Sequence, residues 1–123
     1  MSEHPLFDLI TYLETIAVAV RRLEEEGDVI LRERGQDAFT AKMTEKARLL
    51  AGLGEKGRPL AEKVGGESGR AIVRRLDQFS ASAGASLRIG SVFFMTALLY
   101  PADHKAGEPN DLEAYIGTLR EKL

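Results

Sequence analysis

The stretch GSVFFMTALLYPADH, Gly90 to His104, decides the fold class, because its apolar part has three interpretations. Between Val92 and Tyr100 the single polar residue is Thr96. A short apolar run of this kind suits a buried strand, part of a membrane span, or a helix with more apolar surface than its own domain covers. The run is too short to cross a bilayer, which takes about 20 residues. We therefore expect no membrane insertion.

The residues before this run favour a helix over a strand. Apolar and small residues recur at alternating steps of three and four and lead into the run: Ile72, Leu76, Phe79, Ala83, Leu87, Gly90, Phe94 and Ala97. That spacing is typical of a helix that packs against another helix. We expect one long helix from near Gly69 up to Pro101, since proline disfavours the helical state of the residue before it.

On such a helix the apolar side chains of the run cover every side: Val92, Phe93, Phe94, Met95, Ala97, Leu98 and Leu99. A helix that is apolar all round must be buried all round, and a bundle of few helices has difficulty surrounding one of its own members. The side chains are therefore either core beneath the C-terminal helix or a surface that binds a partner. Methionine and aromatic residues are common on partner-binding surfaces.

Helical spacing also dominates the first part of the chain, at Leu6, Leu9, Leu13, Ile16, Val20, Leu23, Gly27 and Ile30. Pro5 suits a first helical turn, and Gly35 suits a C-terminal stop. Gly27 weakens the pattern by about 1 kcal/mol relative to alanine, which leaves an earlier end open. Because the seam stays in phase through Ile30, we expect one helix of about 30 residues, or about 45 Å.

A shorter second helix is expected to begin with Asp37 as its cap. Its apolar positions are Phe39, Met43, Ala47, Leu50 and Leu53, with Lys46 on the outside. Six glycines and Pro59 within residues 52–69 then predict a loop, with one helical turn at most over residues 59–64. The string GLGEKG, residues 52–57, matches the dinucleotide motif G-x-G-x-x-G, but it follows a helix rather than the required strand, which favours a turn.

The chain closes with a short helix. Asn110 followed by Glu113 forms a capping-box pattern, and Leu112, Ile116, Leu119 and Leu123 give the helix an apolar stripe. No segment shows the alternation of a strand between turns. The predicted fold class is all-α: one domain, residues 1–123, formed by an antiparallel bundle of two long helices, a shorter middle helix and a short C-terminal helix.

Composition limits the classes of function. The chain has 123 residues, 44% of them hydrophobic and 29% charged, which is ordinary for a globular protein. A formal net charge of −2 gives no electrostatic case for binding nucleic acid, and the absence of cysteine excludes thiol chemistry. The N-terminal residues include Glu3, Asp8 and Glu14 and no early Lys or Arg, unlike a secretory signal, so we expect a cytoplasmic protein.

No motif for catalysis, a cofactor or a metal is present. The two histidines, His4 and His104, lie outside any H-E-x-x-H motif and have no Glu three residues before them, so we expect a solvated cap and a loop residue. Glu24, Glu25 and Glu26 are expected to form a solvated helix face. We therefore expect a non-enzymatic protein that holds no cofactor or metal.

The segment LEEEGDVILRERGQDAFTAKMTEKARLLAGL, Leu23 to Leu53, resembles the N-terminal helical hairpin of the FlgN-type flagellar export chaperones. In both, a Leu- and Glu-rich helix runs to a short polar break, and the next helix has an acidic residue near its start and a Lys followed by two Leu. The comparable positions here are Asp37, Phe39, Met43, Lys46, Leu49 and Leu50. The resemblance implies a bundle that holds export substrates, chiefly the hook-associated junction proteins, by packing their C-terminal amphipathic helices.

The function we expect is a helical binding module in which residues 111–123 cover an apolar groove until a client helix replaces them. The expected groove consists of Val92, Phe93, Phe94, Leu98 and Leu99, and the expected cover of Leu112, Ile116 and Leu119. Two alternatives remain open. One is a structural homo-oligomer whose same apolar surface closes a symmetric dimer. The other is a small-ligand-binding protein that uses the glycine-rich segment 52–69.

Overall fold

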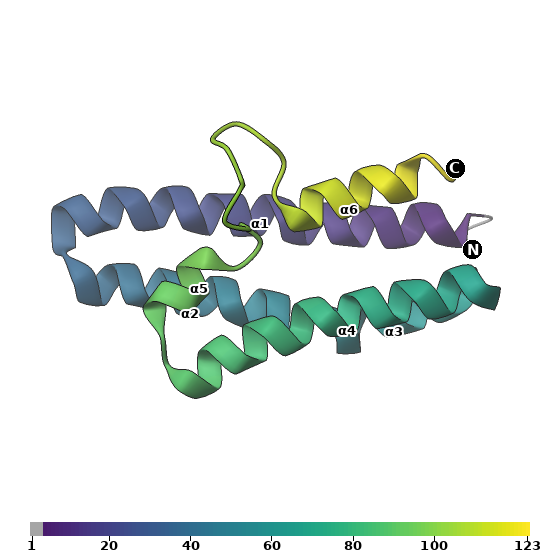
Figure 1. Ribbon diagram of the computed structural model, residues 1–123, viewed down its shortest axis with the longest axis horizontal. Helices are drawn as coiled ribbons and strands as arrows, with labels where there is room; N and C mark the ends of the chain where they lie inside the picture. The colour runs from purple at the N-terminus through teal and green to yellow at the C-terminus, as the bar shows by residue number, and fades with distance from the viewer. Residues whose placement is uncertain (1–3) are drawn as a thin grey trace.

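The computed structural model describes residues 4–123 and is all-α over that range, as the helical spacing predicts; Glu3 lies outside the described residues. Six helices follow one another (Figure 1): α1 Pro5–Arg34, α2 Gln36–Ala51, α3 Leu53–Val64, α4 Gly66–Ile89, α5 Val92–Ala97 and α6 Asp111–Arg120. The predicted helical-bundle class is confirmed, although the bundle contains more helices than the sequence indicates.

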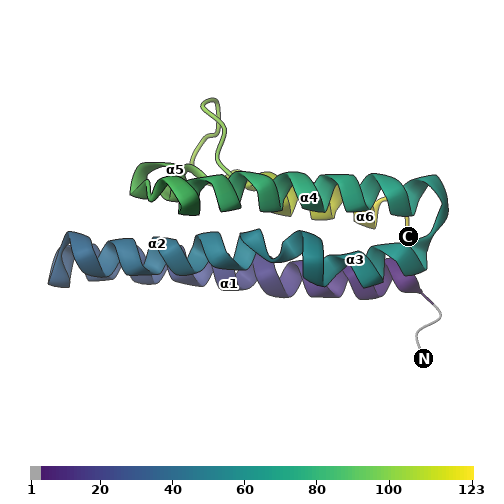
Figure 2. The same cartoon turned by 90° about the horizontal axis from the view of Figure 1, so that it is seen from below.

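The helices lie in two layers. Figure 2 shows α1, α2 and α3 in one layer and α4, α5 and α6 in the other. α1 and α2 form an antiparallel hairpin, and α3 continues in the direction of α2 along the first half of α1. The chain reverses direction at Gly35 and again at Gly65 and Gly66, where φ angles of 85°, 71° and 62° suit glycine.

The first helix is unbroken over its 30 residues, as expected, and Gly27 lies buried within it. A Cβ atom on Gly27 would come within 3.0 Å of Met43 Cε and 3.4 Å of the Phe39 ring. The glycine therefore allows α2 to approach α1 closely. The second helix differs from expectation at its start: α2 begins at Gln36 after Gly35, and Asp37 lies in the first turn without capping it.

The loop expected over residues 52–69 is wrong, because residues 53–64 form α3, with Pro59 inside it. Two of its glycines face α4 at very short range. A Cβ on Gly54 would lie 2.5 Å from Asp77 Oδ1, and a Cβ on Gly57 would lie 2.6 Å from Leu76 Cδ1. These glycines permit close helix packing rather than flexibility, and the GLGEKG string presents no open loop to a ligand.

The expected continuous helix up to Pro101 is also wrong. α4 ends at Ile89, and Gly90 takes a left-handed conformation with φ 70° whose N–H bonds the carbonyls of Ser86 and Leu87. The Ser91 side chain then caps α5 by accepting the Phe94 N–H at 3.1 Å. A C-terminal glycine followed by an N-cap serine is a recognisable helix-break pattern, which the in-phase apolar seam concealed.

Most buried side chains form one core between the layers, to which α1, α2, α3, α4 and α6 contribute together with Leu99. A smaller cluster joins α5 to α2, where Met95 packs with Met43 and Ala47. α6 begins with the predicted capping box: the Glu113 N–H donates to Asn110 Oδ1 at 2.9 Å, and the Asn110 N–H donates to Glu113 Oε1 at 2.9 Å.

Gly69 provides a test of the close contact between α3 and α4. A Cβ there would lie 2.8 Å from the backbone oxygen of Ala61, which cannot move without shifting a helix. We expect Gly69→Ala to lower the free energy of unfolding by about 1–3 kcal/mol. The matched control is Gly117→Ala, where a Cβ meets nothing within 4 Å, and the helix gains about 0.5–1 kcal/mol. Urea denaturation measures both, and equal effects would contradict the packing.

Candidate functional site

The strongest candidate for an interaction site is an exposed apolar surface where α4 ends and α5 begins. Ile89, Phe93 and Phe94 have 66%, 74% and 49% of their surfaces exposed, and we call these three residues the α5 surface. The two phenylalanine rings meet edge to face with centroids 5.7 Å apart. Beside them runs a shallow groove of about 450 Å³ whose apolar lining includes Ala85, Ile89, Phe94, Ala97 and Leu98.

The five residues predicted to form a groove divide into two groups. Phe93 and Phe94 are exposed and belong to the α5 surface. Val92 and Leu98 are half-buried and Leu99 is buried, and they hold α5 and the residues after it against the bundle. The apolar run therefore has one exposed side and one buried side, contrary to the expectation of a helix that is apolar and buried all round.

The structure brings the predicted cover together with only Leu98 and Leu99 of the predicted groove. Leu112, Ile116 and Leu119 are buried in the main core, where α6 packs along α1. α5 packs instead against α2 and α4. Residues 98–110 carry the chain across the bundle between α5 and α6 (Figure 1), and at the start of this segment Leu98 and Leu99 join the core that α6 enters. These three α6 residues are core, and the α5 surface has no cover in the described chain.

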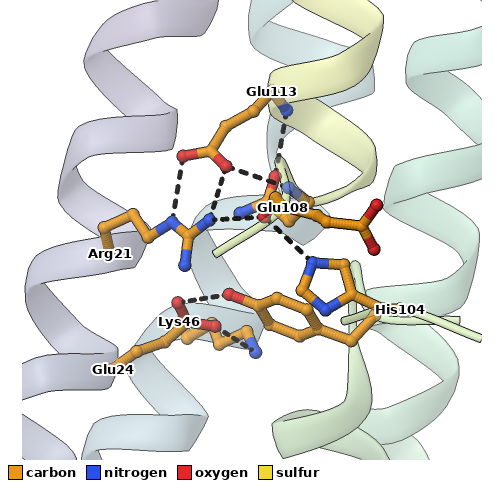
Figure 3. A network of polar contacts seen from close by, with 8 residues as sticks. Arg21, Glu24, Lys46, His104, Glu108 and Glu113 are labelled. Carbon is orange, nitrogen blue, oxygen red and sulfur yellow. Dashed lines mark hydrogen bonds and ion pairs between the residues drawn. The ribbon is translucent and has the colours of Figure 1, made fainter. Parts of the chain in front are cut away.

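A buried polar network centred on Lys46 lies at the C-terminal end of α5 (Figure 3). The Lys46 side chain is fully buried, and its ammonium lies 2.9 Å from Glu24 Oε2 and donates to the Thr96 carbonyl at 3.0 Å. The Tyr100 hydroxyl donates to the other Glu24 oxygen at 2.7 Å. The expectations that Lys46 lies outside and that Glu24 is solvated are both wrong, because the chain after α4 folds back over them.

This network determines where α5 lies. The Thr96 carbonyl belongs to the last turn of α5 and has no helical partner of its own, so the Lys46 ammonium both satisfies it and complements the negative end of the helix. Burial lowers the pKa of Lys46, and the neighbouring Glu24 carboxylate opposes that shift. Burial and the bond to Glu24 raise the pKa of Tyr100 to about 12. Tyr100 therefore keeps its hydroxyl proton at neutral pH and can donate to Glu24.

A second set of contacts fixes the segment between α5 and α6. Arg21 of α1 donates two hydrogen bonds to the Glu113 carboxylate, from Nε to Oε2 at 2.9 Å and from Nη2 to Oε1 at 2.6 Å. The Glu108 carbonyl lies 3.5 Å from Arg21 Nη2 and 3.0 Å from His104 Nε2, and the His104 ring packs against Tyr100. His104 is a loop residue, as expected.

One backbone feature shows how tightly this segment is held. Leu99 has φ 76°, a left-handed conformation that costs a branched side chain about 1–2 kcal/mol. Its side chain is buried in the main core, and its carbonyl accepts the N–H of Asp111 at 3.0 Å. Core packing and α6 therefore hold Leu99 in a conformation that it would not adopt alone.

The network positions segments rather than meeting a ligand from solvent, because the Lys46 ammonium is enclosed by Glu24, Thr96 and the Tyr100 ring. Among residues 4–123, no three His, Cys, Asp or Glu side chains gather as they would around a metal ion. His4 stands exposed at the N-cap position of α1, where its side chain makes no capping bond.

A sequence pattern indicates this network, although the apolar stripe alone places Lys46 on the outside of its helix. Lys46 follows Met43 by three residues and precedes Leu50 by four, so it shares a helix face with two buried positions. Glu24 follows Val20 by four residues and precedes Gly27 by three, so it also shares a helix face with two buried positions. A lysine and a glutamate on the facing seams of one predicted hairpin indicate a buried pair.

Comparisons with protein-family models, with curated proteins and with solved structures find no match to this chain. Within residues 4–123, no helix combines the length and the apolar character needed to cross a bilayer. Fold and site together define the class of the protein: an all-α bundle that exposes an aromatic surface on a short helix held by a buried lysine.

Lys46→Met tests the buried network. Removing the ammonium leaves the Glu24 carboxylate and the Thr96 carbonyl without their partner, and breaking a buried pair in this way costs about 3 kcal/mol of the free energy of unfolding. Lys42→Met is the matched control, because Lys42 also joins α2 to a glutamate of α1, Glu26, but both side chains are partly exposed. We expect the control to change stability by less than about 1 kcal/mol. Equal losses in urea denaturation would contradict the account.

Glu113→Gln tests the contact with Arg21 through its pH dependence. The hydrogen bond from Arg21 lowers the pKa of Glu113, so the contact stabilises the fold above the unfolded pKa of about 4.3 and is lost as the pH falls through the lower folded pKa. Glutamine keeps a capping side chain. We expect the variant to be about 1 kcal/mol less stable at neutral pH and equal to the wild type in strong acid. Urea denaturation at stepped pH measures this, and a constant difference would contradict it.

Proposed function

We propose that this protein is a non-enzymatic helical binding module that packs an amphipathic helix of a client protein against the α5 surface. The observation that carries the proposal is the exposure of Phe93 and Phe94 on α5, next to a groove that Ile89 at the end of α4 also lines. Large apolar side chains that gather on a surface are typical of protein-binding sites, and aromatic residues are enriched there.

The shape and rigidity of the site support a helical client. The groove beside Phe94 runs between α4 and the residues after α5, and an amphipathic helix docks in such a groove through side chains at steps of three and four. α5 is held through Thr96 and Met95, so the surface is formed before a client arrives. A preformed surface loses little conformational entropy on binding.

The resemblance of residues 23–53 to FlgN-type chaperones favours one form of this proposal. In that form the protein acts in the cytoplasm as an export chaperone and holds the C-terminal amphipathic helix of a substrate before secretion. Displacement of α6 has no part in the mechanism, because Leu112, Ile116 and Leu119 are core residues. The client instead adds directly to α4 and α5.

Peptide binding tests the proposal. The probe is a fluorescent peptide with amphipathic helical spacing, compared with a scrambled peptide of the same composition. We expect the wild type to bind the amphipathic peptide, and Phe93→Ser with Phe94→Ser to weaken that binding at least about tenfold, because buried aromatic anchors carry most of the energy of such contacts. Fluorescence anisotropy gives the dissociation constants.

The matched control is Phe7→Ser, which removes a side chain of similar exposure, 55%, from α1 and should leave peptide binding unchanged. Two results would overturn the proposal. One is equal binding of the scrambled peptide. The other is a wild-type oligomer that the Phe93 and Phe94 substitutions convert to a monomer, which would make the α5 surface part of a structural homo-oligomer instead.

A further inference from the structure

The outer side of α1 carries a second exposed apolar surface. α1 occupies a corner of the bundle, with α2 and α3 on one side and α6 on another, so that its remaining side has no neighbour (Figures 1 and 2). Phe7, Val18 and Val29 on this helix have 55%, 59% and 44% of their surfaces exposed. Exposed apolar side chains therefore recur at intervals of 11 residues along this helix.

These three residues belong to one helix face. With about 100° between successive residues, Arg32 lies about 40° from the direction of Val18, and between Phe7 and Val29 seven positions lie within that angle. We call them the outer face of α1: Phe7, Thr11, Glu14, Val18, Arg22, Glu25 and Val29. The steps between them are four, three and four residues up to Val18, and four, three and four again after it. The spacing is therefore the same in both chain directions.

This symmetry has a consequence for two copies of the helix. Suppose that a second α1 lies antiparallel on the first, with the two Val18 residues opposite each other. A residue that precedes Val18 by a given number of positions then faces the residue of the other copy that follows Val18 by the same number. Phe7 then faces Val29, and Glu14 faces Arg22. Each of these matched pairs occurs twice, because a two-fold axis repeats every contact. A parallel arrangement would instead place Glu14 against Glu14 and Arg22 against Arg22.

The two charged residues are available for these contacts. Arg22 is exposed and makes no ion pair within the described chain. Glu14 pairs with Arg120 of α6 through one carboxylate oxygen, and a carboxylate accepts several hydrogen bonds. Thr11 would face Glu25 of the other copy, and its hydroxyl already donates to the Phe7 carbonyl at 3.0 Å, so it brings no unsatisfied donor to the contact.

On the surface of α1, Val18 lies between two hollows, as a ridge does at a helix-packing site. One hollow, of about 390 Å³, lies between α1 and α6 and is bordered by Ala17, Val18 and Ile116 together with six charged residues: Glu14, Arg21, Arg22, Glu25, Glu113 and Arg120. Another, of about 460 Å³, lies on the other flank and is bordered by Thr15, Val18 and Ala19. A ridge between two hollows matches the way in which ridges of one helix fill grooves of another.

We propose that the outer face of α1 is a homodimer interface, on which a second copy of this chain packs its own α1 antiparallel about a two-fold axis at Val18. Apolar contacts lie at the centre and at both ends, and the Glu14–Arg22 pairs between them specify the antiparallel register. α5 lies in the other layer of the bundle, so the dimer leaves both α5 surfaces open (Figure 2). The inference stands independently of the client-binding function.

Cysteine crosslinking tests the register directly, because the natural chain contains no cysteine. Val18→Cys should form a disulfide-linked dimer under mild oxidation, since position 18 meets its own copy. Thr11→Cys is the matched control: it lies on the same exposed face, but its own copy is 14 residues away along the helix, or about 21 Å, beyond the reach of a disulfide. A mixture of Phe7→Cys and Val29→Cys chains should crosslink to each other.

A charge exchange tests the specificity of the contact. We expect Arg22→Glu and Glu14→Arg each to weaken dimerisation at least about tenfold, because each places like charges opposite one another twice. The double variant restores opposite charges and should recover most of the wild-type affinity, as measured by sedimentation equilibrium. Circular dichroism checks that each variant keeps its helical content.

Three results would overturn the dimer proposal. They are a wild-type chain that stays monomeric at high concentration, equal crosslinking of Thr11→Cys and Val18→Cys, and a double charge variant that dimerises no better than the single ones. None of them depends on peptide binding at the α5 surface.

Discussion

The arrangement of α5 depends on the contacts that the buried ammonium of Lys46 makes. One side chain from α2 reaches the Glu24 carboxylate of α1 and the Thr96 carbonyl of α5 and so joins three helices. A buried ammonium is costly without partners, so both contacts must persist in the folded protein. This requirement fixes a six-residue helix that could not hold its shape in isolation. Phe93 and Phe94 consequently face solvent on a rigid support.

The α1 helix connects the two surfaces for which functions are proposed. Its inner side contributes Glu24 to the network beneath α5, and its flank holds α6 through Arg21. Its outer face carries the symmetric pattern centred on Val18. The two exposed surfaces lie in different layers, so a dimer formed through α1 would present two α5 surfaces to a client (Figure 2). Two linked sites raise the effective concentration of a client that has two matching helices.

Much of the fold could be predicted from the sequence, because apolar periodicity and caps are local patterns. The extent of α1 and the capping box at Asn110 are examples. The glycines at 54 and 57 led to the wrong prediction of a loop over residues 52–69. From sequence alone, a glycine that permits close helix packing cannot be distinguished from one in a loop, because the neighbour across the interface is not known. The site was predictable in part: Phe93 and Phe94 are exposed, but the burial of Lys46 depends on the turn at Gly90, which returns α5 over α2.

The account rests most directly on the claim that Lys46 holds α5 in place. Amide hydrogen exchange of Lys46→Met measures this residue by residue, with Lys42→Met as the control. We expect the amides of Met95 and Leu98 to exchange much faster in the Lys46 variant, while amides in the middle of α4 keep their protection relative to the control. Unchanged protection of α5, or an equal loss in both helices, would show that packing of Met95 alone positions α5 and would contradict the account.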